Sequence, residues 1–163
     1  MFKKLLTTRS MCVSAIIAAL YAALTMLLAP ISYGAIQCRV SEAFTLLPIL
    51  LPEAVPGLFL GCLISNLFSP AVTIWDIVFG SLSTLLAACG TYALRKKPVL
   101  AALCPVLANG LIVGTVLSMT LGLPVALTMG EVALGELVAV ALGFVLLSAL
   151  KKAKFDAKSL SKR

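Results

Sequence analysis

The stretch MCVSAIIAALYAALTMLLA, from Met11 to Ala29, decides the fold class of this chain. It contains no charged residue, and as a helix it is about long enough to cross the ~30 Å hydrocarbon core of a bilayer. Similar apolar stretches follow as far as Leu150, interrupted by one basic cluster and a few single charged residues. We therefore predict an all-α integral membrane protein.

The composition of the whole chain agrees with this prediction. Its 163 residues are 61% hydrophobic and only 12% charged, with a mean hydropathy of +1.13. A soluble domain usually carries about 25% charged residues, so this chain has too few to cover a surface that faces water. Its net charge of +7 is gathered in clusters beside the apolar stretches. We therefore expect the lipid bilayer, and no nucleic acid, as its surroundings.

The residue types also limit the chemistry of the protein. The chain has no histidine, which is the commonest metal ligand and general base. Its five cysteines are scattered, without the spacing of a metal site. We expect no metal, no cofactor and no catalytic residue. A membrane-embedded enzyme is disfavoured because a serine or cysteine nucleophile would lack its usual base.

Proline, glycine and basic residues divide the apolar region into six predicted spans. These are Met11–Ala29, Arg39–Leu51, Gly57–Phe68, Ile74–Leu94, Val99–Leu121 and Val125–Leu150. Basic residues precede the first span and follow the fourth and the sixth, and such residues mark cytoplasmic loops. Both termini are therefore expected in the cytoplasm. The alternative, that the first span is a secretory signal peptide, would leave five spans and break this charge pattern.

The predicted organisation is a single membrane domain. A short cytoplasmic N-terminus (residues 1–10) precedes a six-helix bundle (11–150), and a basic cytoplasmic tail (151–163) follows it. An autonomous small secondary transporter is an alternative architecture. It predicts inverted repeats or helices broken at matching positions, and the sequence shows no convincing repeat.

Nine side chains within or beside the spans are the candidate ligand-binding residues. A charged side chain at the bilayer centre costs at least ~2.5–3.5 kcal/mol, so such residues usually face a protein interior or a ligand. Most lie in the predicted outer half of the membrane, with the last two deeper: Gln37, Arg39, Glu42, Asn66, Trp75, Asp76, Glu131, Asn109 and Glu136. Glu131 and Glu136 are about 140° apart around a helix, so at most one of them faces a narrow cavity. We infer a cavity that opens outward.

Several of these residues have a structural alternative. Arg39 and Glu42 stand at positions i and i+3 and can pair with each other. Trp75 is typical of an aromatic belt at the membrane interface. Asp76 suits the start of a helix, and Asn109 suits a hydrogen bond between helices.

The first span carries a separate pattern of small residues. Ala15, Ala19 and Ala23 recur every fourth position. This spacing creates a flat strip that lets another helix approach closely. The sequence leaves open whether that helix belongs to this chain or to a partner.

The segment YGAIQCRVSEAFTLLP, from Tyr33 to Pro48, resembles a signature of the QueT family. Members of that family are the substrate-binding (S) components of energy-coupling factor (ECF) transporters for queuosine precursors. The resemblance extends over essentially the whole chain in size, span number and alanine-rich first helix. Its most specific part is Arg39 to Pro48.

The resemblance implies a six-helix protein of the bacterial plasma membrane. It would bind a deazaguanine from outside, either prequeuosine or its nitrile precursor. It would have no ATPase of its own, and the chain indeed lacks a phosphate-binding loop. Its implied partners are a transmembrane T component, docking on Ala15, Ala19 and Ala23, and two cytoplasmic ATPases. An S component for another small vitamin or nucleobase remains the alternative.

The candidate residues fit a deazaguanine chemically. A guanine-like edge presents two adjacent donors, and one carboxylate accepts both. A cationic aminomethyl arm would bind a second carboxylate. The ring carbonyl would bind a donor such as the side chain of Asn66, Asn109, Gln37 or Arg39.

Overall fold

The computed structural model describes residues 7–32, 39–68 and 73–153. Within these ranges the chain is helical and has no β-strand, as predicted for an all-α protein. The elements are α2 (Thr8–Leu27), α3 (Ala29–Ser32), η1 (Val40–Ile49), α4 (Ala54–Leu67), η2 (Asp76–Gly80), α5 (Ser81–Ala93), α6 (Pro98–Leu121) and α7 (Val125–Lys152). η1 is a 3₁₀ helix, and η2 is a π-helical turn that leads directly into α5.

Four helical segments are long and apolar enough to cross a membrane. They are α2, the continuous run of η2 and α5, α6, and α7. The other two apolar helices are shorter, with 10 residues in η1 and 14 in α4. At about 2.0 Å per residue for a 3₁₀ helix and 1.5 Å for an α-helix, each is about 20 Å long. The chain is therefore a multi-pass membrane protein in which four of the six predicted spans have full length.

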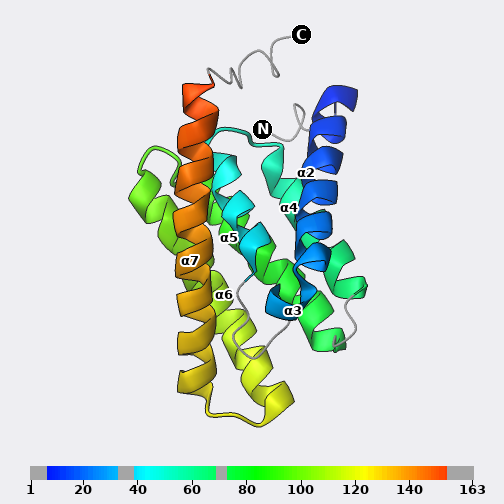
Figure 1. Cartoon of the computed structure of the whole chain (residues 1–163), viewed down its shortest axis with the longest axis vertical. Coiled ribbons are helices and arrows are strands. Elements are labelled where there is room, and N and C mark those ends of the chain that lie inside the picture. Colours follow the sequence, from blue (N-terminus) through cyan, green and yellow to red (C-terminus); the bar gives the residue numbers. More distant parts are fainter. Residues whose placement is uncertain (1–6, 33–38, 69–72, 154–163) are drawn as a thin grey trace.

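The segments pack side by side and run alternately in opposite directions along the long axis of the molecule (Figure 1). As a result, α2 begins at the end of the molecule where α7 finishes, and the connection between α5 and α6 lies toward the same end. That connection contains Arg95, Lys96 and Lys97, all of them exposed. The predicted basic clusters of the described residues thus gather at one end.

Two helices begin three residues earlier than predicted because of how the backbone groups of their first turns are accommodated. α2 begins at Thr8 rather than Met11, since the Thr7 side chain accepts a hydrogen bond from the Ser10 N–H over 3.3 Å. α4 begins at Ala54 rather than Gly57, so Pro56 lies inside its first turn instead of bounding it. Proline is tolerated there because a first-turn N–H has no partner within the helix.

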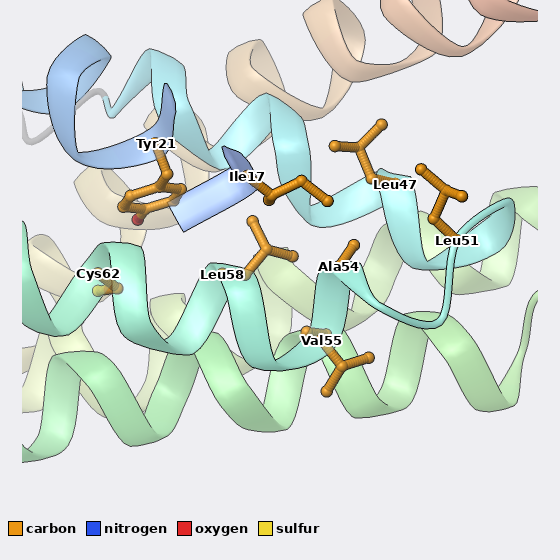
Figure 2. Packing of buried hydrophobic residues seen from close by; sticks show 9 residues of the cluster. Ile17, Tyr21, Leu47, Leu51, Ala54, Val55, Leu58 and Cys62 are labelled. Atoms are coloured by element: carbon orange, nitrogen blue, oxygen red, sulfur yellow. The ribbon is translucent and has the colours of Figure 1, made fainter. Parts of the chain in front are cut away.

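A hydrophobic cluster joins α2, η1, α4 and α5. In Figure 2, Ile17 and Tyr21 of α2 lie over Leu58 and Cys62 of α4. Two glycines of α4 permit this approach: a Cβ would lie 2.7 Å from the Ser14 carbonyl oxygen at Gly57 and 2.8 Å from the Ala18 oxygen at Gly61. The close pairing of α2 and α4 fixes the position of Tyr21, whose hydroxyl group reaches the site described next.

Candidate functional site

Three charged side chains are buried among the described residues, and all three line the same cavity. Arg39 is 8% exposed, Glu42 1% and Glu136 5%. The remaining lining residues are Asn109, Val113 and Val132. The cavity has a volume of about 10 Å³, room for roughly one water molecule. The charged residues are thus held in a tight space shielded from solvent.

The 3₁₀ helix η1 brings two of these side chains to the cavity. Arg39 directly precedes η1, and Glu42 lies in its first turn. Both side chains line the cavity, so they reach it from the same side of η1. The Nη1 atom of Arg39 lies 3.7 Å from Sγ of Cys62 on α4. Pro48 also disfavours α-helical geometry, because in an α-helix its ring would clash with the carbonyl group of the residue four positions earlier.

Glu42 accepts hydrogen bonds at one of its two oxygens. Its Oε1 atom accepts from the hydroxyl groups of Tyr21 on α2 and of Thr84 on α5, the latter at 3.2 Å. The Thr84 hydroxyl also lies 3.3 Å from Sγ of Cys62. The Oε2 atom of Glu42 is buried and has no hydrogen-bond partner in the described part of the chain.

Glu136 of α7 also has one carboxylate oxygen that accepts a hydrogen bond and one that is open. Asn109 Nδ2 donates to Glu136 Oε1 over 2.7 Å, and Ser83 Oγ donates to Asn109 Oδ1 over 2.5 Å. The Glu136 Oε2 atom is buried without a partner among residues 7–32, 39–68 and 73–153. An unsatisfied buried acceptor costs about 1–3 kcal/mol, and more when it is charged. The two open oxygens, one on each glutamate, are therefore candidate positions for the donors of a ligand.

Asn66 and Asp76 lie away from the cavity wall. Asn66 is buried, and its Nδ2 atom lies 3.1 Å from the Asp76 backbone oxygen and 3.5 Å from Sγ of Cys62. The Asp76 carboxylate accepts from the N–H and the hydroxyl group of Thr73, over 3.1 and 2.7 Å. Neither side chain lines the cavity. Cys62, which also contacts Arg39, connects Asn66 to the site.

Trp75 faces a different hollow. It is 59% exposed and stacks on Phe79, with ring centroids 5.9 Å apart. Both rings line an apolar groove of about 930 Å³ between α6 and the run of η2 and α5. None of the groove's lining residues is charged. We place the candidate site in the smaller cavity because that is where the buried charges lie.

The two glutamates of α7 differ in position. Glu136 lines the cavity, whereas Glu131 is half-buried and does not. Gln37 lies outside the described residues. Of the nine candidate residues, the structure thus brings four to one cavity: Arg39, Glu42, Asn109 and Glu136.

Sequence reasoning missed the hydroxyl groups that hold the two carboxylates. Tyr21 lies within an otherwise apolar span, and Ser83 and Thr84 carry no charge that would distinguish them in the sequence. The available signal was the run SLST, Ser81 to Thr84, which is unusually rich in hydroxyl groups for a membrane-spanning segment. Such side chains hydrogen-bond between helices in membranes.

A family model described as QueT transporter matches residues 11–152. The chain belongs to the QueT transporter family. This confirms the resemblance carried by Tyr33 to Pro48, and it is a family of transporters rather than enzymes. The queuosine precursor transporter QueT of Lactococcus lactis subsp. cremoris (strain MG1363) is 45% identical over 73 residues. That alignment covers 44% of this chain and 42% of the relative, less than half of its length. No solved structure matches the chain.

Proposed function

We propose that this QueT-family chain is the substrate-binding (S) component of an ECF importer and that it binds a queuosine precursor. The supporting observation is the cavity in which Arg39, Glu42 and Glu136 meet. Buried charges in a membrane protein are costly and commonly mark a ligand path. The name of the Lactococcus relative supports a deazaguanine as the ligand.

In this proposal Glu42 accepts the two adjacent donors of the guanine-like edge. Its Oε2 atom is open. Its Oε1 atom keeps the hydrogen bond from Tyr21 but can accept a second donor from the ligand when Thr84 turns its hydroxyl toward Cys62, which lies 3.3 Å away. Arg39 and Asn109 carry the N–H donors at the cavity and suit the ring carbonyl. Asn66, Trp75, Asp76 and Glu131 fall outside this set of contacts, and Gln37 remains a prediction.

Ligand entry requires the cavity walls to separate. The cavity has room for about one water molecule, and a bicyclic base is several times larger. η1 is the element best suited to move, because it carries Arg39 and Glu42 and because 3₁₀ hydrogen bonds have poorer geometry than α-helical ones. Binding is therefore a two-step process in this proposal, with opening of η1 followed by closure over the base.

We further propose six spans with both termini in the cytoplasm of a bacterium. The alternating directions of the segments support six crossings, with η1 and α4 as short spans (Figure 1). The gathering of basic residues at one end supports the orientation, since such residues mark the cytoplasmic side.

The T component, acting with two ATPases, is proposed to dock on the exposed face of α2. Ala15, Ala19 and Ala23 are all exposed, whereas Ala18 and Ala22 are buried within the bundle. The exposed strip therefore remains available to a helix of another protein. Small residues at this spacing allow such a helix to pack closely.

Calorimetry on the purified protein in detergent tests the proposed ligand. We expect stoichiometric binding of prequeuosine or of its nitrile precursor, without chemical conversion of either. Guanine shares the donor edge and serves to measure how much affinity the edge alone provides, while riboflavin is the unrelated vitamin control. Binding of riboflavin alone, or of none of the four compounds, would refute a deazaguanine specificity.

A further inference from the structure

We propose that Glu136 determines specificity by making the site select a ligand that carries a positive charge. This inference rests on the proposed function and adds the charge of the substrate to it. Its basis is the imbalance of charge at the cavity. Two carboxylates, of Glu42 and Glu136, line the cavity with one guanidinium, of Arg39.

The imbalance is not corrected by other charged side chains in the described part of the chain. The basic residues there other than Arg39 are exposed: Arg9, Arg95, Lys96, Lys97, Lys151 and Lys152. The two internal stretches outside the described residues, 33–38 and 69–72, contain no Lys, Arg, Asp or Glu. One guanidinium offsets one carboxylate, so a second carboxylate remains without a counter-charge. Burial of such a group is strongly unfavourable unless a cation or a proton compensates it.

The uncompensated carboxylate is assigned to Glu136 by its surroundings. Glu42 lies three residues from Arg39, on the same side of η1, and accepts from the hydroxyls of Tyr21 and Thr84. The hydrogen bond to Glu136 comes from the neutral amide of Asn109. A neutral amide satisfies one oxygen but supplies no positive charge. The open Oε2 atom of Glu136 is therefore the best place in the cavity for a ligand cation.

The class of ligand follows from this assignment. An ammonium group on a short arm would form a charge-assisted hydrogen bond with Glu136, and such bonds are about twice as strong as neutral ones. A nitrile on the same ring carries no donor and no charge, so it would leave the carboxylate uncompensated. The site should thus select the aminomethyl deazaguanine over the nitrile form. Glu42 accepts the donors of the guanine-like edge that both ligands share.

The test compares the two ligands by calorimetry on the parent, Glu136→Gln and Glu131→Gln. The parent should bind the aminomethyl compound about a hundredfold more tightly than the nitrile, because a charge-assisted contact is lost with the nitrile. Glu136→Gln should reduce this ratio to within about threefold by weakening only the aminomethyl compound. Glu131→Gln alters a glutamate of the same helix that does not line the cavity, and it should keep the parent's ratio.

Several results would overturn the inference. Equal affinities in the parent, or tighter binding of the nitrile, would contradict it without any variant, while leaving the proposed function intact. An equal loss for both ligands in Glu136→Gln would show that Glu136 reads the shared edge instead. If Glu136→Gln does not fold, Glu136→Asp is used in its place. This variant keeps the charge and should keep the preference for the aminomethyl compound. Loss of that preference in folded Glu136→Asp would contradict the inference. Failure of the parent to bind either compound would instead refute the proposed function.

Discussion

At the scale of single residues, the site combines side chains that the sequence places at different depths. Arg39 and Glu42 were expected near the outer surface, and Asn109 and Glu136 deeper in the membrane. The structure brings all four to one cavity because η1 packs laterally against α6 and α7. The charge of a residue and its depth along a predicted span can both be inferred from an apolar sequence, and together they predicted these residues as candidates. The sequence does not show which helices are neighbours, since every span has a similar composition.

The partners of the carboxylates illustrate the same limit. Tyr21 and Thr84 are neutral, and burying them demands much less compensation than burying a charge. Their role becomes visible only when their hydroxyls are seen to donate to Glu42. Conversely, helix geometry alone fixes the separation of Glu131 and Glu136 at about 140°, which predicts that at most one of them faces a narrow cavity. Glu136, and not Glu131, lines the cavity described above.

At the scale of elements, the long helices could be predicted and the irregular ones could not. Apolar length and flanking residues located α2, α6 and α7 to within about three residues at each end. The 3₁₀ form of η1 and the π-helical turn η2 depend on packing that no periodicity records. Gly80, at the end of η2, shows such a constraint: a Cβ there would lie 3.1 Å from Asn66 Nδ2.

The two faces of α2 lead to a prediction about how ligand binding is coupled to uptake. One face packs on α4, and the exposed face carries Ala15, Ala19 and Ala23. Ala19→Trp should abolish uptake of prequeuosine in cells while leaving its affinity in detergent unchanged, because the bulky ring blocks a partner helix without reaching the cavity. Leu20→Trp is the control, since Leu20 is a large exposed residue of α2 about 100° around the helix from Ala19. Normal uptake by Ala19→Trp would exclude the strip as the docking surface.

At the scale of the whole molecule, the arrangement of segments predicts which loops face the outside. A cysteine replacing Ser69, in the connection between α4 and η2, should react with an impermeant thiol reagent added to intact cells. A cysteine replacing Lys96, between α5 and α6, should react only after the cells are opened. Labelling above that of the parent is the quantity to measure, because the parent has cysteines of its own. Labelling of Lys96→Cys in intact cells would reverse the proposed orientation.

The central claim is that the cavity of Arg39, Glu42 and Glu136 is where this QueT-family protein binds its ligand. The most direct test is the affinity of purified Glu42→Gln for prequeuosine, beside Glu131→Gln as the control outside the cavity. The amide keeps the shape of the side chain but replaces an acceptor with a donor, so Glu42→Gln should lose about a hundredfold in affinity, whereas Glu131→Gln should bind like the parent. If Glu42→Gln melts at the parent's temperature and binds prequeuosine with the parent's affinity, the ligand does not bind in this cavity.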